Sequence, residues 1–286
     1  VGKSWLALSA AVSLATAWPL FSYYEVRRSY RVAFLDLESR PWETDQRLHR
    51  IAAGMGATAE ALGDHVQVIR RRLRLDAPDD LRRLMASLES WKTDFLIVDS
   101  FRRAFRGNEN DSGIVSDIFT ATLDRLRLDL GVGTILLDHT RKTTGEPDLD
   151  SPDQSLRGST DKRNMVDFHL GIEARTGGLA LTPTKTRHGR KPEPVVLELA
   201  GLDGEDHEGP VLVKFSRHAD PASDRVADAV LVLLGDAGDA GLLRGEIIGR
   251  SGFKERTVGA ALRDLKARGR ITRQTEGHAV RYRVEK

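Results

Sequence analysis

A glycine, a lysine and a serine follow one another near the start of the sequence: Gly2, Lys3 and Ser4. This order ends the phosphate-binding pattern G-x-x-x-x-G-K-[ST], where glycine admits the phosphate, lysine reaches its oxygens and the hydroxyl binds Mg²⁺. Apolar residues then recur at three- to four-residue spacing from Leu6 to Ala15, as on the helix that such a loop opens. The match covers only three positions, so its value depends on the rest of the chain.

The same apolar stretch admits a second interpretation, a secretory signal or a membrane span. The residues that interrupt it are Ser9, Ser13, Thr16 and Pro19. They leave it short of the roughly 20 apolar residues that a span needs. The chain has no cysteine, so no disulfide framework indicates an oxidising compartment. Because no methionine begins the sequence, we expect the natural protein to extend upstream and to supply the first half of the loop. We expect a cytoplasmic protein without membrane association.

Acidic side chains end two apolar runs further along. Asp99 closes the run LIVD, and ligands of open α/β sheets bind at the carboxyl ends of the strands. We therefore expect Asp99 to hold Mg²⁺. Glu38 follows AFLDL and could accept a proton from an attacking water, with Asp36 as the competing acid. An acid after a strand is often only a loop cap. The assignments of Asp99 and Glu38 therefore gain weight only when they are taken together.

The elements that must position these residues alternate between two patterns. We expect strands at 31–37, 65–69, 94–100 and 133–140, and helices at 42–56, 81–91 and 113–130. Such alternation predicts a parallel sheet with helices on both faces. Four more apolar runs, at 166–174, 178–189, 194–200 and 210–216, predict consecutive antiparallel strands. The fold class is therefore α/β, mainly parallel with late antiparallel strands.

Composition sets the broad limits. A chain of 286 residues with 40% apolar and 30% charged residues, and a mean hydropathy of -0.36, is typical of a soluble globular protein with room for two domains. The net charge of +2 argues against indiscriminate nucleic-acid binding by the whole chain. Residues 244–286, however, carry 12 Lys and Arg against 5 Asp and Glu.

Six short motifs occur in the order found in one known family. They are GKS (2–4), FLDLESRPWETDQRLHR (34–50), LIVDSFRRAF (96–105), NENDS (108–112), LDHTRK (137–142) and RGSTD (157–161). In this order, over roughly residues 1–200, the sequence resembles the RecA-fold ATPases, most closely the RepA-like hexameric helicases with AAA-type domains. The resemblance implies a RecA-like P-loop NTPase core that uses ATP and Mg²⁺.

The resemblance also implies roles for individual residues. The implied phosphate and Mg²⁺ ligands are Gly2, Lys3, Ser4 and Asp99. Glu38 would be the catalytic carboxylate, and His139, after the run TILLD, would sense the γ-phosphate. The chain departs from the family at Ser39, which replaces an acid, and at Asp138, which replaces the first of two histidines. The sensor role therefore depends on His139 alone.

A basic hairpin is expected at TPTKTRHGRKP (182–192). Its K-x-R-x-G pattern resembles the hairpin of DnaB-type helicases, whose basic residues reach the nucleotide of the neighbouring subunit. The resemblance makes Lys185 and Arg187 candidates for that role in trans. Arg157 is a further candidate. A cation of this kind accelerates phosphoryl transfer by about 10³ to 10⁵ in the best cases. A solvated hairpin tip is the equally weighted alternative.

The basic end of the chain has its own pattern. We expect domains at 1–215 and 224–286, joined by an exposed linker at 216–223. Three helical segments and two alternating strands predict a winged helix-turn-helix in the second domain. The residues expected to contact DNA from the third helix are Lys254, Arg256, Thr257 and Arg263, and those from the wing are Arg273, Arg281 and Arg283. A protein-docking module is the alternative interpretation.

These patterns together indicate an ATP-hydrolysing, DNA-associated motor of the RepA-like helicase type. We expect a homo-oligomeric ring, with a hexamer as one candidate form, and DNA as its partner. Two alternatives remain open from the sequence. One is an ATP-gated DNA-binding regulator that does not unwind DNA, and the other is a degenerate interaction module without catalytic activity.

Overall fold

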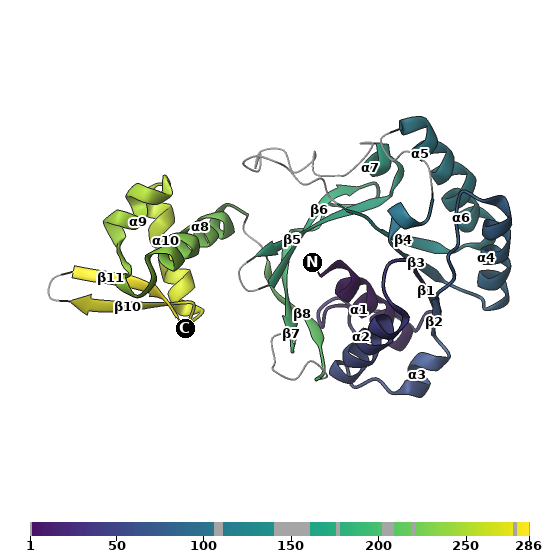
Figure 1. The fold of residues 1–286 in the computed structure, drawn as a ribbon, viewed down its shortest axis with the longest axis horizontal. Coiled ribbons are helices and arrows are strands. Elements are labelled where there is room, and N and C mark those ends of the chain that lie inside the picture. Colours follow the sequence, from purple (N-terminus) through teal and green to yellow (C-terminus); the bar gives the residue numbers. More distant parts are fainter. Residues whose placement is uncertain are drawn as a thin grey trace. The chain divides into compact units, whose positions relative to one another are not determined.

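The computed structural model describes residues 2–105, 111–139, 161–175, 178–201, 209–218, 221–276 and 279–285. The chain divides into two compact units. The larger unit comprises residues 1–174 and 178–217, and the smaller one comprises residues 175–177 and 218–286. The elements of both units are labelled in Figure 1.

A four-stranded parallel sheet forms the centre of the larger unit. Its strands are β1 (Val32–Asp36), β2 (Val66–Ile69), β3 (Phe95–Asp99) and β4 (Gly133–Leu137), in the order β2-β1-β3-β4. The register pairs Asp36 with Asp99 and Asp99 with Leu137, so the acidic ends of the strands lie at one edge of the sheet. The mixed α/β architecture with this sheet fits the expected RecA-like core.

Helices cover both faces of the sheet because side chains alternate along each strand. On one face, Phe34 and Ile97 pack against α1 (Lys3–Thr16), α2 (Pro41–Gly54) and α3 (Ala59–Gly63). On the other face, Leu35 and Val98 contribute to the core formed with α4 (Pro78–Ser90), α5 (Ser112–Ile118) and α6 (Asp124–Leu130). A short 3₁₀ turn, η1 (Phe101–Arg103), follows β3.

The single helix expected at 113–130 is interrupted. A π-helical turn, η2 (Phe119–Leu123), lies between α5 and α6. Within this turn, the Thr122 hydroxyl donates a hydrogen bond to the carbonyl of Leu75 at 3.1 Å. Single π turns are not distinguishable from α-helix by apolar periodicity, which is why the sequence predicts one continuous helix.

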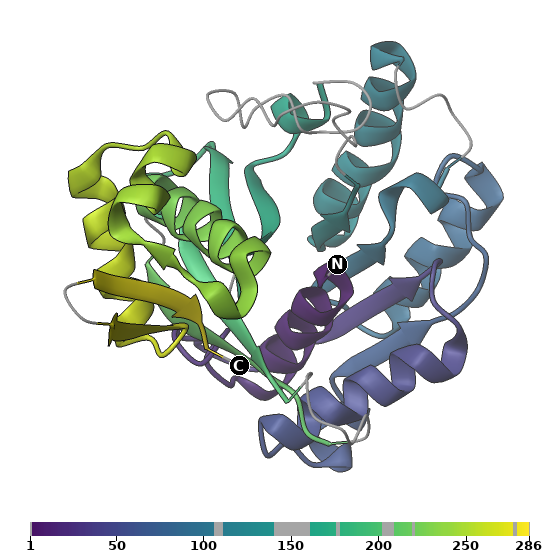
Figure 2. The same ribbon diagram turned by 60° about the vertical axis from the view of Figure 1, so that its left-hand side comes forward.

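A second sheet packs against the opposite side of α1. Its strands are β5 (Phe168–Arg175), β6 (Gly178–Thr186), β7 (Val195–Ala200) and β8 (Leu212–His218), in that order, with β6 and β7 antiparallel. The short helix α7 (Asp161–Met165) precedes them. Leu6 of α1 packs with Leu179 and Leu197, whereas Ala11 and Val12 belong to the core under the parallel sheet. Figures 1 and 2 show α1 between the two sheets.

The described part of the smaller unit combines three α-helices and a 3₁₀ turn with three strands. Its elements are α8 (Pro221–Ala237), η4 (Gly238–Ala240), β9 (Leu242–Leu243), α9 (Arg244–Ser251), α10 (Glu255–Ala267), β10 (Ile271–Glu276) and β11 (Ala279–Val284). The strand order is β10-β11-β9, so β11 lies in the middle. The core of this unit includes Val230, Ile247, Val258 and Leu262, and so draws on all three helices.

The expected linker at 216–223 is largely replaced by secondary structure. Strand β8 continues to His218, and helix α8 begins at Pro221. The segment resembles a linker in composition because polar residues end the strand and a proline follows. Proline is, however, also favoured at the start of a helix. Strand β9 is a further element that the sequence pattern did not predict, because two residues are too few to show alternation.

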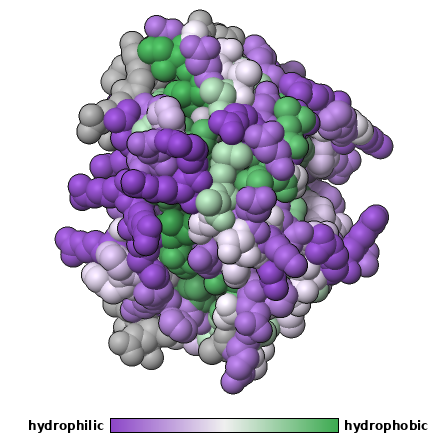
Figure 3. All heavy atoms as spheres, turned by 90° about the vertical axis from the view of Figure 1, so that its right-hand side faces the viewer, coloured by the Kyte–Doolittle hydropathy of each residue, from purple (hydrophilic) through white to green (hydrophobic). Residues whose placement is uncertain are grey.

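No helix in the described part of the chain is long and apolar enough to cross a membrane. Figure 3 shows one face of the molecule, on which hydrophilic residues surround several separate strips of hydrophobic ones. Leu128 of α6, with 69% of its surface exposed, is one of the large apolar residues at the surface.

Candidate functional site

The residue that precedes helix α1 has a backbone that favours glycine. Gly2 has φ 97° and ψ -16°, in the left-handed region. A Cβ at this position would lie 2.6 Å from Cδ1 of Leu179 on β6. The dihedral angles therefore favour glycine, and any side chain would also have to displace the end of Leu179. This backbone brings Lys3 and Ser4 into the first turn of α1, facing the carboxyl ends of β3 and β4.

Lys3 points at the end of strand β4. Its Nζ donates a hydrogen bond to the carbonyl oxygen of Asp138 at 2.6 Å and lies 3.2 Å from Nδ1 of His139. Burial lowers the pKa of Lys3 below its usual value, and the negative charges of Asp138, Asp99 and Glu38 oppose this shift. The ammonium group is therefore partly dehydrated and has acids around it. Such a group gains from a further anion at close range.

Ser4 contacts the acid at the end of strand β3. Its hydroxyl donates a hydrogen bond to Oδ2 of Asp99 at 2.6 Å. Burial raises the pKa of Asp99, and the nearby Glu38 and Asp36 raise it further, while Ser4 and Lys3 act in the opposite direction. The ionised form of Asp99 is thus disfavoured, as expected for a carboxylate that a bound cation would stabilise.

The two acids after strand β1 have different environments. Asp36 is buried, and its Oδ1 accepts hydrogen bonds from the backbone N–H groups of Glu38 (3.2 Å) and Ser39 (2.9 Å). Its Oδ2 accepts a hydrogen bond from the hydroxyl of Thr44. Asp36 therefore shapes the loop. Glu38 remains 39% exposed, and its Oε1 lies 3.5 Å from Nε2 of His139.

His139 consequently lies between two expected site residues. Its Nδ1 faces the Lys3 ammonium, which can only donate, so this nitrogen is the acceptor and Nε2 carries the proton toward Glu38. The structure thus brings together five of the expected residues: Lys3, Ser4, Glu38, Asp99 and His139.

One charged residue of this cluster was not expected from the sequence. Lys162 on α7 has only 5% of its side chain exposed, and its Nζ lies 2.8 Å from Oδ2 of Asp138. The ammonium also lies 5.0 Å from the centre of the Phe101 ring. Asp138, the residue that departs from the family pattern, accepts hydrogen bonds from both Lys3 and Lys162. Lys162 directly follows the RGSTD motif, but nothing in that position predicts its contact with Asp138, 24 residues earlier in the chain.

The cluster has the donors that Mg²⁺ and a phosphate chain require. Mg²⁺ bound with a nucleotide takes one or two protein oxygens and completes its shell with phosphate and water. Ser4 and Asp99 offer such oxygens, and the raised pKa of Asp99 is consistent with a site for a cation. Among the residues that the structure describes, no group of three or more His, Asp or Glu side chains forms a metal site. The residues present therefore fit Mg²⁺ held jointly with phosphate.

The residues of the expected basic hairpin contact their own subunit. Lys185 Nζ donates hydrogen bonds to the carbonyls of Arg163 (2.9 Å) and Asn164 (2.6 Å) near the end of α7. Arg187 pairs with Asp167 at 3.0 Å and is half exposed. Arg157 lies outside the described residues, as do most of the NENDS and RGSTD motifs. Within the described part of the chain, no hydrogen bond or ion pair joins Lys185 or Arg187 to Lys3.

The basic residues expected to meet DNA fall into two groups. Lys254, Arg256, Arg263 and Arg273 are exposed, and Thr257 is partly buried. Arg281 and Arg283, in contrast, are engaged within the smaller unit. Arg281 donates to the carbonyl of Gly241 at 3.3 Å, and Arg283 donates to the side-chain oxygen of Gln274. The acceptor of Arg281 precedes β9, and that of Arg283 lies on β10.

Comparison with known proteins gives one family. A family model described as an AAA domain matches residues 1–145, just over half of the chain. No curated protein matches the sequence. The matched range includes the start of α1 and the ends of β1, β3 and β4, and so contains every expected nucleotide-site residue that the structure brings together. By this match, the chain belongs to the AAA domain family of P-loop ATPases.

Proposed function

We propose that the protein hydrolyses ATP at the start of helix α1. The observation that carries this proposal is the joint position of Lys3, Ser4 and Asp99 at the carboxyl ends of the parallel strands, with His139 and Glu38 beside them. Ligands of open α/β sheets bind at this edge. The N-terminus of α1 adds backbone N–H groups and a favourable dipole for an anion.

Each side chain has a defined role in this proposal. Lys3 pairs with phosphate oxygens, and Ser4 and Asp99 hold Mg²⁺, which neutralises charge on the transferred phosphoryl group when bound. Glu38 orients the attacking water and accepts its proton, since its carboxylate is accessible and Asp36 is not. His139, linked to both Lys3 and Glu38, connects the phosphate end of the site to the base.

We further propose that ATP turnover is coupled to DNA, as in a motor of the RepA-like helicase type. Three features support this. The motif order over residues 1–200 resembles that family, the smaller unit has the helix and hairpin content of a winged helix-turn-helix, and its third helix α10 exposes basic residues. A homo-oligomeric ring belongs to the same proposal, with Lys185, Arg187 or Arg157 acting on the neighbouring subunit.

The test of ATP hydrolysis is phosphate release by the full-length protein, including any residues encoded before Val1, with Mg²⁺ present. Lys3→Ala should reduce turnover to background, because it removes the phosphate contact. Arg82→Ala, an exposed substitution on α4, is the matched control and should leave turnover unchanged. Turnover of Lys3→Ala at the parent rate would remove the basis of the assignment.

The test of DNA coupling is the same assay with and without DNA. A motor should show DNA-stimulated turnover and strand separation of a forked duplex. An ATP-gated regulator should show ATP-dependent DNA affinity without strand separation. A degenerate module should show neither ATP turnover nor ATP-dependent binding.

A further inference from the structure

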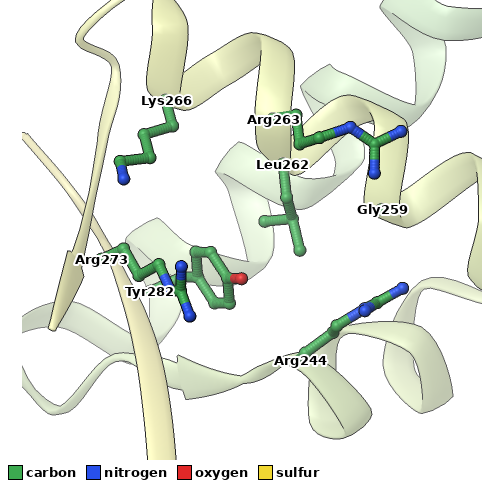
Figure 4. A pocket seen from close by; sticks show the side chains of 7 residues that line it. All are labelled: Arg244, Gly259, Leu262, Arg263, Lys266, Arg273 and Tyr282. Carbon is green, nitrogen blue, oxygen red and sulfur yellow. The ribbon is translucent and has the colours of Figure 1, made fainter. Parts of the chain in front are cut away.

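A pocket of about 230 Å³ lies in the smaller unit between α10, β10, β11 and the start of α9. It is lined by Arg244, Gly259, Leu262, Arg263, Lys266, Arg273 and Tyr282. Four of these residues are cations and none is an acid. Figure 4 shows Lys266 and Arg273 on one side of the pocket, Arg244 and Arg263 on the other, and Leu262 and Tyr282 between them.

The cations of this pocket are available to a ligand. Within the described residues, no hydrogen bond or ion pair engages Arg263, Lys266 or Arg273. Arg244 pairs with Glu255 at 3.2 Å, but both side chains are largely exposed, so this contact is weak. Four like charges around one hollow repel one another, and a bound anion would relieve that repulsion.

The helix itself does not create this site. The lining residues of α10 lie in its middle and last turns, where the helix dipole is neutral or unfavourable to an anion. An anion must therefore be held by the side chains. Arg244 comes from α9 and Arg273 from β10, so the tertiary fold brings separate parts of the sequence together there.

Gly259 shapes the pocket. A Cβ at this position would lie 2.9 Å from an NH2 nitrogen of Arg244 and 3.8 Å from NH1 of Arg263. The absence of a side chain thus lets the Arg244 guanidinium lie against α10. A glycine inside a helix costs about 1 kcal/mol relative to alanine, and this close approach gives a physical reason for it.

We propose that this pocket seats a backbone phosphate of DNA. The proposal rests on the proposed DNA association and specifies it. Phosphate contacts are made mainly by Arg and Lys, and two or more of them can converge on one phosphate. The pocket is smaller than the roughly 300–1,000 Å³ typical of drug-sized ligands, which favours a single anionic group. This phosphate contact on β10 and α10 is separate from the one expected from Arg281 and Arg283, whose guanidinium groups donate to Gly241 and Gln274 within the unit.

The test is fluorescence anisotropy of the full chain on a labelled random duplex at several salt concentrations. The pocket variant Lys266→Gln/Arg273→Gln should bind roughly tenfold more weakly and lower the salt slope by about one unit, as for one lost phosphate. Its matched control is Arg250→Gln/Arg268→Gln, which removes two exposed cations that do not line the pocket. The control should lose less than about threefold.

A second variant separates the pocket from net charge and from folding. Gly259→Leu keeps every charge and raises helix propensity, and its side chain fills the space in which the Arg244 guanidinium lies against α10. It should weaken DNA binding several-fold. Equal losses in the pocket and control variants, or parent-like binding by Gly259→Leu, would overturn the phosphate pocket while leaving DNA association intact.

Two further outcomes identify the source of the phosphate. If the parent chain fails to bind duplex at low salt, the proposed DNA association itself fails, and the pocket loses its assigned ligand. Inorganic pyrophosphate at matched ionic strength should weaken duplex binding by the parent more than by the pocket variant, because it competes with the DNA phosphate for the pocket. Pyrophosphate that binds the parent in calorimetry without weakening duplex binding would show that the pocket is a small-anion site and that the DNA assignment is wrong.

Discussion

Replacing Lys162 by methionine should destabilise the larger unit strongly. The substitution keeps much of the side-chain volume but leaves the Asp138 carboxylate without the cation 2.8 Å away. The two side chains are only 5% and 14% exposed, so water cannot replace the lysine well. Removing one partner of a buried pair costs about 3–5 kcal/mol. Asp138 keeps the hydrogen bond from the backbone N–H of His139, at 2.8 Å, so we expect about 3 kcal/mol.

Urea unfolding followed by tryptophan fluorescence measures this loss in the correct unit. The four tryptophans are Trp5, Trp18, Trp42 and Trp91. All of them lie in the larger unit, so unfolding of the smaller unit does not contribute. For a unit of this size, 3 kcal/mol corresponds to a decrease in Tm of about 6–12 °C.

Two variants make the result specific to the buried pair. Arg82→Met breaks the exposed ion pair with Asp79 and should cost at most about 1 kcal/mol. Adding Asp138→Asn to Lys162→Met removes the stranded charge and should restore at least 1 kcal/mol, since the asparagine oxygen can still accept from His139. The reasoning is refuted if Lys162→Met unfolds within about 0.5 kcal/mol of the parent. Strict additivity of the two substitutions would equally contradict it.

Three further substitutions test the nucleotide site. Glu38→Gln should retain ATP binding, measured by calorimetry, and lose about 10²- to 10⁴-fold in turnover; unchanged turnover would rule out Glu38 as the base. Asp99→Asn should weaken Mg²⁺-dependent nucleotide binding and yet stabilise the nucleotide-free protein at pH 7. The pKa of Asp99 is raised by burial, so the stability it contributes is present at low pH and is lost as the pH rises through the folded-state pKa. In urea unfolding, the advantage of Asp99→Asn should therefore vanish as the pH falls toward 3.8, and an advantage independent of pH would contradict this origin. Arg187→Ala mixed with parent protein should reduce turnover more than in proportion to its fraction if it acts in trans; a linear decrease would indicate a role within its own subunit.

The parallel sheet and its acidic edge follow directly from the sequence. Runs such as VAFLD and FLIVD are apolar throughout, as strands covered on both faces must be, and each ends in an acid. Once these strands are parallel and adjacent, their carboxyl ends must meet. The proximity of Ser4 to Asp99 therefore required no information beyond the strand order and the start of α1.

The choice between Asp36 and Glu38 did not follow from the sequence, because it depends on the loop after β1. Asp36 turns inward to accept hydrogen bonds from two backbone N–H groups, and this leaves Glu38 accessible. Lys162 was missed for a different reason. It lies 24 residues after Asp138, and only the tertiary fold brings the two side chains together. No local pattern marks a lysine that becomes buried through such a contact.

The wing arginines illustrate a third limit. Arg281 and Arg283 share a face of β11, so alternation alone predicts that both could point at DNA. In the structure, Arg281 donates to the carbonyls of Ala240 and Gly241, just before β9, and Arg283 donates to the side chain of Gln274 on β10. Alternation along one strand gives the face of a side chain, but it does not give the oxygens that the tertiary fold places beside that side chain.

The nucleotide site also shows why its charged groups are informative as a set. Burial lowers the pKa of Lys3 and raises that of Asp99, so both ionised forms are disfavoured by the same cause. A phosphate chain alone would stabilise Lys3 but add negative charge beside Asp99 and Glu38. A divalent cation alone would stabilise Asp99 but add positive charge beside Lys3. Only the two together favour both ionised forms, which is the electrostatic reason to assign this cluster to Mg²⁺ with a nucleotide and not to either ligand by itself.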